Sequence, residues 1–130
     1  VHELAPGRRL VRLHREKVMV RLGQGVFLTG KLDRNAVRRT VHAFRHFRRV
    51  ASELHATKII AFGTSALREA SDRDRFLDTI RRRCGIDVRV ISGEEEARLI
   101  AAGVLSHLRN GRGRYALVDI GGGSTEVSVC

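Results

Sequence analysis

The fold of this chain is decided by the stretch Tyr115-Ala116-Leu117-Val118-Asp119-Ile120-Gly121-Gly122-Gly123-Ser124-Thr125-Glu126. An apolar strand runs into three successive glycines. Because glycine adopts positive φ and has no side chain, this bend leaves backbone N–H groups uncovered for an approaching phosphate. Asp119 closes the incoming strand and Glu126 opens the outgoing one, so a hairpin brings both carboxylates to the same end. The pattern predicts a phosphate-binding loop, with an ordinary glycine-rich turn and two solvent-facing acids as the alternative.

Two carboxylates beside a phosphate also suit a divalent cation. Mg²⁺ prefers oxygen ligands and is usually shared between protein and phosphate. We therefore expect Mg²⁺, or another divalent cation, at Asp119 and Glu126. The helical pair His42 and His46 is a weaker metal candidate, because no acidic residue lies between the two and arginines surround them. A solvated helix face is the better interpretation of that pair.

Length and composition set the class of protein. The 130 residues fit one domain, and the chain opens at Val1 without Met and stops one strand past the glycine bend, which predicts a fragment with a second half missing. Hydrophobic residues make up 42%, but no apolar run has the length of a membrane span, so we expect a soluble globular protein. Charged residues interrupt the first stretch, which does not resemble a signal peptide, so we expect a cytoplasmic location. Two cysteines without Cys-x-x-Cys spacing predict neither zinc nor a disulfide framework.

The charge of the chain indicates an anionic partner. Lys and Arg number 25 against 14 Asp and Glu, a net charge of +11, and such an excess attracts nucleic acid, nucleotides or inorganic polyphosphate. Many of the arginines fall on predicted helices, where they also serve as ordinary solvent-facing side chains. The charge alone therefore supports such a partner only weakly.

Hydrophobic periodicity predicts alternating strands and helices. In order, they are a hairpin (8–13 and 17–22), a long helix capped by Asp33, a strand (58–62), a helix from about Asp72 to Arg83 with Ser71 as cap and Gly85 as stop, a strand (86–91), a helix (93 to about 108) and the 116–126 hairpin. Alternation of this kind indicates an α/β layer whose parallel strands are linked by helices. In such sheets ligands bind at the carboxyl ends of the strands, where 63–65, Ser92 and Asp119 stand.

The acidic helix start Ser92-Gly93-Glu94-Glu95-Glu96 has two interpretations. Ser92 and Glu95 form a capping box, and the helix dipole explains Glu94. Glu96 falls within about 20–40° of the apolar face, where a carboxylate could be desolvated and act as a general base. The alternative is a structural salt bridge with an arginine such as Arg68. Arg68 itself could reach the cleft as a phosphate fork, or pair at the surface with a nearby acid.

Three stretches, taken together, resemble the exopolyphosphatase/guanosine-pentaphosphate phosphohydrolase (Ppx/GppA) family of the actin-like ATPase superfamily. They are Gly63-Thr64-Ser65-Ala66-Leu67-Arg68-Glu69-Ala70, Ile91-Ser92-Gly93-Glu94-Glu95-Glu96-Ala97-Arg98-Leu99-Ile100 and Val118-Asp119-Ile120-Gly121-Gly122-Gly123-Ser124-Thr125-Glu126. The resemblance runs from about Val18 to the end. It implies a ribonuclease-H-like α/β domain, a mixed sheet with helices packed on it, whose N-terminal strand and partner domain are missing here.

The resemblance also implies residue roles. Glu96 resembles the general base that activates water, Arg68 the arginine that contacts substrate phosphate, and Asp119 with Glu126 the acids that hold the cation. The second phosphate-binding loop is matched by Gly121, Gly122, Gly123, Ser124 and Thr125. The implied reaction is in-line attack of water on a terminal phosphoryl group of polyphosphate or guanosine pentaphosphate. We expect the full-length protein to act on these substrates as a homodimer. The isolated 130-residue piece is expected to be inactive.

Two rival functions stay open. One is an ATP-binding kinase or ATPase of the same superfamily, because a glycine hairpin after Asp also cradles ATP there. The other is a basic nucleic-acid-binding module. The chain has only six aromatic residues (five Phe and one Tyr) and no aromatic-basic interleaving, which argues against nucleic acid.

Overall fold

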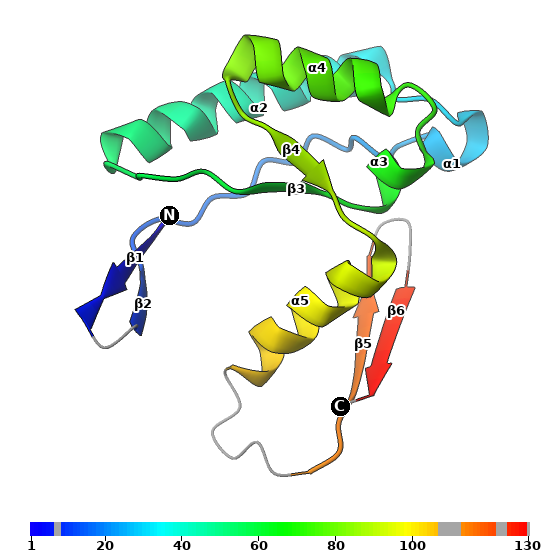
Figure 1. Cartoon of the computed structure of the whole chain (residues 1–130). Helices are drawn as coiled ribbons and strands as arrows, with labels where there is room; N and C mark the ends of the chain where they lie inside the picture. The colour runs from blue at the N-terminus through cyan, green and yellow to red at the C-terminus, as the bar shows by residue number, and fades with distance from the viewer. Residues whose placement is uncertain (7–8, 107–112, 122–124, 130) are drawn as a thin grey trace.

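The computed structural model describes residues 1–6, 9–106, 113–121 and 125–129, without the side chains of Arg9 and Glu126 (Figure 1). The strands are β1 (His2–Ala5), β2 (Arg9–Arg12), β3 (Ala61–Gly63), β4 (Val88–Val90), β5 (Ala116–Ile120) and β6 (Thr125–Val129). The helices are α1 (Val26–Thr29), α2 (Arg34–Glu53), α3 (Ser65–Glu69), α4 (Arg73–Cys84) and α5 (Gly93–Leu105). No helix in these described ranges is long and apolar enough to cross a membrane.

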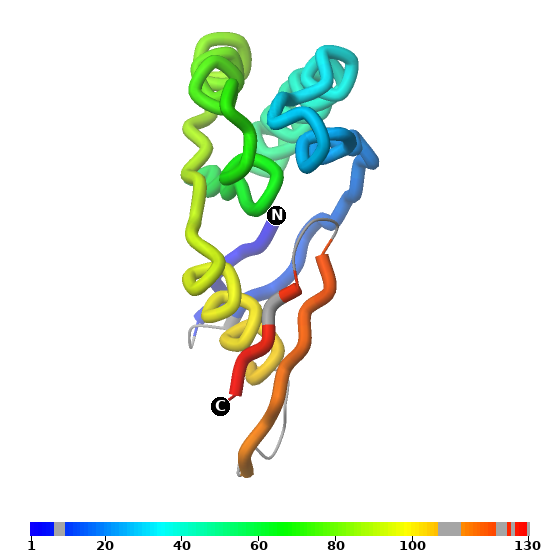
Figure 2. Tube along the Cα trace, turned by 90° about the vertical axis from the view of Figure 1, so that its right-hand side faces the viewer, coloured from blue at the N-terminus to red at the C-terminus, as the bar shows by residue number. Residues whose placement is uncertain are grey.

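The hydrophobic core lies in the layer built by α1 to α4 with β3 and β4. Helices α2 and α4 lie side by side over the two strands (Figures 1 and 2). Their inward side chains meet those of α1 and α3 in one cluster of buried residues: Val26, Leu32, Val41, Leu67, Ala70, Phe76, Ile80, Cys84 and Ile86. Burial of this apolar area drives the layer together.

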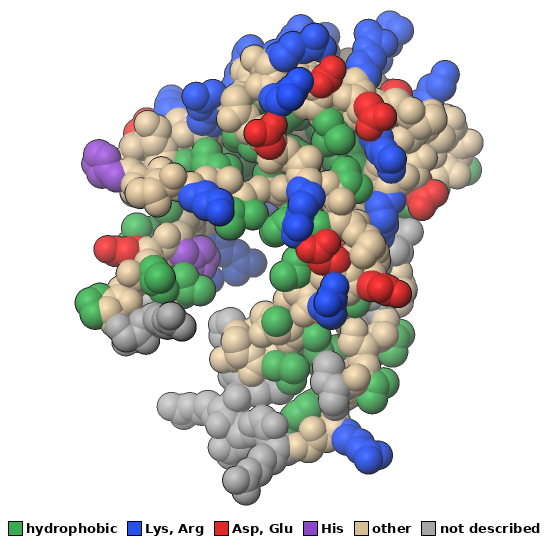
Figure 3. All heavy atoms as spheres, in the orientation of Figure 1, with side chains coloured by type: hydrophobic (Ala, Val, Ile, Leu, Met, Phe, Trp, Pro, Cys, Tyr) green, Lys and Arg blue, Asp and Glu red, His purple; other side chains and the backbone are tan. Residues whose placement is uncertain are grey.

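Helix α2 has the predicted N-cap, and its apolar side chains lie on one face, toward the core. The Asp33 carboxylate accepts a hydrogen bond from Ala36 N at 2.8 Å, which satisfies one of the free N–H groups of the first turn. Val41 on its inward face is 5% exposed, while the opposite face carries arginines. In Figure 3, Lys and Arg side chains gather over the α2 and α4 layer.

The predicted cap of α4 was wrong. Its N-cap residue is Asp72, which makes no side-chain capping bond. Ser71 Oγ instead donates to Gly30 O at 2.8 Å, and Asp72 Oδ1 accepts from Leu32 N at 3.0 Å. Both polar side chains are used to hold the segment before α2 against the start of α4. The predicted stop at Gly85 is confirmed, since Gly85 takes φ 62°, a conformation natural to glycine.

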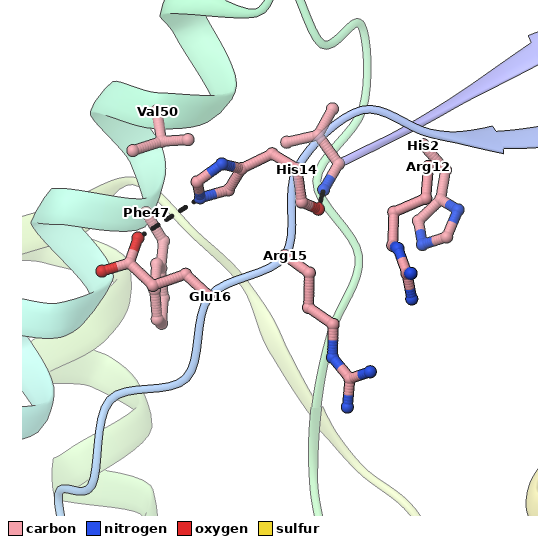
Figure 4. A pocket seen from close by; sticks show the side chains of 8 residues that line it. His2, Arg12, His14, Arg15, Glu16, Phe47 and Val50 are labelled. Atoms are coloured by element: carbon pink, nitrogen blue, oxygen red, sulfur yellow. Dashed lines mark hydrogen bonds and ion pairs between the residues drawn. The ribbon is translucent and has the colours of Figure 1, made fainter.

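The N-terminal hairpin is displaced from its predicted position. Strand β2 pairs antiparallel with β1, and the segment 17–22 forms no strand. Arg39 explains the difference, because its guanidinium donates to Val20 O at 3.1 and 3.2 Å and so occupies a carbonyl that a ladder would need. Glu16 is held to α2 by His46 Nε2 at 2.8 Å and also reaches His14, next to Phe47 (Figure 4).

The hydrogen bond from His46 lowers the pKa of the Glu16 carboxyl, an effect that burial partly opposes. The carboxylate is therefore favoured in the folded chain, where it joins the segment before α1 to helix α2. The contact lies at the surface, so solvent screens it.

Strands β3 and β4 are parallel, with Ala61 opposite Val88 and Gly63 opposite Val90. Both are shorter than the predicted strands 58–62 and 86–91. Phe62 in the middle of β3 is 44% exposed, and the Arg89 guanidinium lies 5.1 Å from its ring centroid. One face of this pair is therefore open in the described part of the chain.

The predicted 116–126 hairpin is present as β5 and β6, which are antiparallel. Within the described residues, however, the strands form three separate two-stranded ladders and not one mixed sheet, since β5 pairs with β6 and not with β3 or β4. Helix α5 packs against both β5 and β6 and ends at Leu105, short of the expected end near residue 108.

Candidate active site

The centre of the candidate site is an ion pair between two predicted site residues. Arg68 Nη1 donates to Glu96 Oε2 at 2.8 Å and to Ile91 O at 3.0 Å. The side chains of Arg68 and Glu96 are 22% and 15% exposed, so the pair is shielded from bulk water but reachable. The salt bridge that we gave as the alternative is therefore present. It joins the candidate general base, Glu96, to the candidate phosphate-binding arginine, Arg68.

The backbone around β3 brings Arg68 to this place. Helix α3 begins directly after Thr64, and Leu67 on its first turn packs so closely over Gly63 that a Cβ on Gly63 would clash with the Leu67 side chain. Buried Leu67 thus holds α3 against the end of β3. Arg68, the next residue, points across to the end of β4, because it donates to Ile91 O.

The start of α5 brings Glu96 to the same place. Ile91 N donates to Gly63 O at 3.0 Å and prolongs the parallel pair up to the cap of α5. Ser92 Oγ then accepts from Glu95 N at 3.1 Å, as the capping box predicts. A Cβ built on Gly93 would lie 4.0 Å from Arg68 Nη2, so the guanidinium lies against the positive end of the helix dipole.

The three neighbouring acids of α5 have different environments. Glu95 forms an ion pair with Arg89 at the surface, and Glu94 is exposed. Glu96 alone of the three contacts Arg68. The prediction that Glu96 faces protein is confirmed, whereas the Glu95 side chain pairs with Arg89 and does not complete the predicted capping box.

A hollow of about 410 Å³ opens beside the carboxyl end of β3. Thr64 and Ser65, which follow β3, line it together with Arg21, Gln24 and Phe27. Arg21 has a positive φ of 52°, an uncommon conformation for a residue with a side chain. Neither this hollow nor the positive φ of Arg21 follows from a sequence pattern.

The hairpin places Asp119 directly opposite Glu126 in the ladder. Asp119 is half-buried, whereas its neighbours Val118 and Ile120 are exposed. Gly121 and Thr125 are exposed at the ends of the two strands. The remaining predicted loop residues, Gly122, Gly123 and Ser124, lie outside the described residues, and so does the side chain of Glu126.

The two halves of the candidate site lie at the same end of the unit formed by α5, β5 and β6. The N-terminal end of α5 and the C-terminal end of β5 both face the β3 and β4 layer (Figures 1 and 2). The structure therefore joins Arg68 with Glu96 by direct contact and sets Asp119 and Glu126 side by side in register. Among the described residues, no group of three or more His, Cys, Asp or Glu could hold a metal ion by itself.

Comparison with known proteins identifies the family of this chain. The sequence model of the Ppx/GppA phosphatase family matches residues 1–130. The chain belongs to this family. Within it, the chain is 37% identical over 120 residues to Exopolyphosphatase 2 of Mycobacterium tuberculosis, covering 88% of this chain and 38% of that protein.

Solved structures of family members have the same fold. An exopolyphosphatase from Cytophaga hutchinsonii superposes with a TM-score of 0.93 at 34% identity, over 98% of this chain and 41% of that one. The Ppx/GppA family member of Aquifex aeolicus gives 0.83 at 26% identity, over 99% and 45%. The chain thus spans less than half the length of these Ppx/GppA relatives.

Proposed function

We propose that the full-length protein hydrolyses the terminal phosphoanhydride bond of inorganic polyphosphate. Membership of the Ppx/GppA phosphatase family supports this, as do similar proteins that carry the name exopolyphosphatase. The observation that carries the proposal is the contact between Arg68 and Glu96 at the ends of β3 and β4. It pairs a phosphate-binding cation with a carboxylate that can accept a proton, as hydrolysis of a phosphoanhydride by water requires.

In the proposed mechanism Arg68 binds the terminal phosphate. A phosphate at the Arg68 guanidinium would also lie at the positive end of α5, where an anion is favoured. Glu96 is then next to that phosphate, because it is 2.8 Å from Arg68. Its carboxylate orients a water molecule and takes its proton as the water attacks phosphorus in line with the leaving phosphate.

Asp119 and Glu126 fit a site for Mg²⁺ or another divalent cation. They are cross-strand partners, and one or two carboxylates plus phosphate oxygens are the usual ligand set for Mg²⁺. When bound, the cation neutralises charge on the phosphate oxygens. The backbone N–H groups of the loop 121–125 hold the same phosphate in our proposal.

Guanosine pentaphosphate is a second candidate substrate within the same proposal. Its terminal bond is also a phosphoanhydride, and the Arg68 and Glu96 pair would act on it in the same way. The ribonuclease-H-like fold class of the actin-like ATPase superfamily is likewise proposed. The parallel pair β3 and β4, connected through α3 and α4, supports it.

The deciding experiment is Glu96→Gln in the full-length protein, with phosphate release measured on both substrates in the presence of Mg²⁺. Glutamine keeps an oxygen that accepts from Arg68 but cannot take a proton from water. We expect kcat to fall about 10²- to 10⁴-fold with little change in KM.

The matched control is Glu94→Gln, the same substitution on the same helix at an exposed position. It should leave kcat within about twofold, as expected for a surface change. If Glu96→Gln turns over as fast as Glu94→Gln, Glu96 is a structural partner of Arg68 and the proposed mechanism fails. Retained turnover of one substrate only would show that this substrate is not hydrolysed with Glu96 as the base.

A further inference from the structure

A basic groove lies between α2 and α4. These two helices lie on the side of β3 and β4 away from α5 (Figure 1), and Lys and Arg side chains gather over them (Figure 3). The volume of the groove is about 640 Å³. The lining residues are Lys31, Leu32, Arg34, Val37, Arg38, Val41, Asp72, Arg75, Phe76, Thr79 and Arg83. None of these residues belongs to the candidate active site, so the groove is a separate feature of the fold.

Five of the lining residues are cations that stay close together without acidic partners. Arg34 and Arg38 follow each other at i,i+4 on α2, and Arg75 and Arg83 lie two turns apart on one face of α4, with Lys31 before α2. All five are exposed, and none forms an ion pair within the described part of the chain. Like charges at this spacing repel one another, and a bound anion would relieve that repulsion.

Three other arginines of the same two helices have acidic partners. Arg49 contacts Glu53, and Arg81 and Arg82 contact Asp78. The sole acid among the described lining residues, Asp72, accepts a hydrogen bond from Leu32 N at 3.0 Å and so serves to join the loop to α4. The groove therefore differs from the surface around Arg49, Arg81 and Arg82, because it gathers five cations that have no ion-pair partner among the described residues.

The floor of the groove decides which kind of anion fits. Leu32, Val41 and Phe76 are only 6%, 5% and 4% exposed, so their apolar surface is already used by the core. An amphipathic helix would find little apolar surface to cover, and a nucleic-acid base would find no aromatic face for stacking. The groups exposed in the groove are cationic side chains above buried apolar residues, and these suit a flexible phosphate polymer without bases.

We propose that the groove between α2 and α4 binds a remote stretch of an inorganic polyphosphate chain. The inference rests on the proposed function in that the same polymer is the substrate. Arg34, Arg38, Arg75, Arg83 and Lys31 contact successive phosphates and hold the polymer on the protein while its end is processed elsewhere. Short substrates do not reach from the active site to the groove and gain nothing from it.

The test is equilibrium binding of labelled polyphosphate to the full-length protein in EDTA, which prevents turnover. The double variant Arg38→Gln with Arg75→Gln removes one cation from each wall. At about 100 mM salt it should bind a chain of about 100 phosphates about tenfold more weakly, and its slope of log affinity against log salt should fall by about 2. Affinity for tripolyphosphate should change less than about twofold.

The matched control is Arg81→Gln with Arg82→Gln, which removes the same charge from α4 outside the groove. It should lower affinity for the long chain less than about twofold. Equal losses in the two double variants would mean general attraction to a basic surface and would overturn the proposal. So would single-stranded DNA of equal phosphate number, if it bound as tightly and with the same sensitivity to Arg38→Gln and Arg75→Gln. Because nothing is hydrolysed here, this outcome is independent of the Glu96→Gln test.

Discussion

The layer of residues 21–91 is much better packed than the α5, β5 and β6 unit of residues 93–129. Every member of the buried core cluster, from Val26 to Ile86, belongs to the first region. In the described part of the second, Ala101 is the single buried residue. The contact between Arg68 and Glu96 joins the two regions, so the candidate site lies where a well-packed layer meets a loosely packed one.

The hairpin shows the same contrast on its two faces. Leu117 and Ser128 are half-buried, on the same side as Asp119, whereas four apolar side chains on the other face are 60–79% exposed: Val118, Ile120, Val127 and Val129. A two-stranded hairpin with one open apolar face has little stability of its own. The position of the acids of β5 and β6 therefore depends on the packing of the hairpin against α5.

The largest effect should come from one substitution made in each region. Ile80 on α4 is 0% exposed and Ile120 on β5 is 79% exposed. Ile80→Ala leaves a cavity in the core and should cost about 2–5 kcal/mol of unfolding free energy. Ile120→Ala removes the same atoms at an exposed position and should lower the unfolding free energy by about 0.5 kcal/mol or less. Chemical denaturation measures both; equal losses would show that the hairpin face is buried in solution.

The contact between the regions should give the next largest effect. A double-mutant cycle of Arg68→Ala and Glu96→Ala should show a coupling of about 1–3 kcal/mol, because the pair is mostly shielded from water. The Arg89 and Glu95 pair, with exposures of 62% and 31%, is the control and should couple by about 0.2–1 kcal/mol. A coupling no larger than that of the control would mean that the two regions are not held together by Arg68.

The sequence predicted the parts of this structure that local chemistry determines. The cap at Asp33, the capping bond of Ser92 and the αL stop at Gly85 were confirmed, because each depends on one residue and its immediate neighbours. The inward position of Glu96 followed from helix periodicity. Pattern and spacing therefore identified the residues of the contact at the junction.

The failures have a common cause, which is competition from distant parts of the chain. Ser71 was expected to cap α4 but donates to Gly30, and Arg39 takes the Val20 carbonyl that a strand would need. The separation of the strands into three ladders is likewise a property of tertiary pairing. No local pattern reports that Ile91 O will accept from Arg68, since any residue offers a carbonyl.

The helix caps offer a smaller comparison of the two regions. Asp33→Ala and Ser92→Ala each remove one capping hydrogen bond and should each cost about 1 kcal/mol. In α2 the surrounding core keeps the helix in place, so the loss should appear in global unfolding. In α5 hydrogen exchange of the first turn should accelerate before global stability changes. Equal local protection in both variants would contradict a difference in packing between the regions.

The smallest effect concerns Cys84, which is buried at the end of α4 in the first region. Burial raises the pKa of the Cys84 thiol, against a smaller opposing influence of Arg45, Arg48 and Arg83. The unfolded chain therefore releases this proton first as the pH rises, and the folded state loses stability above the unfolded thiol pKa of about 8.5. Between about pH 8 and pH 9 the loss should be no more than about 0.7 kcal/mol, the value reached when only the unfolded thiol titrates in this range. Comparison with Cys84→Ala by denaturation isolates it, because all other titrations cancel; a difference between the two proteins that stays constant with pH would show that the thiol is accessible to solvent.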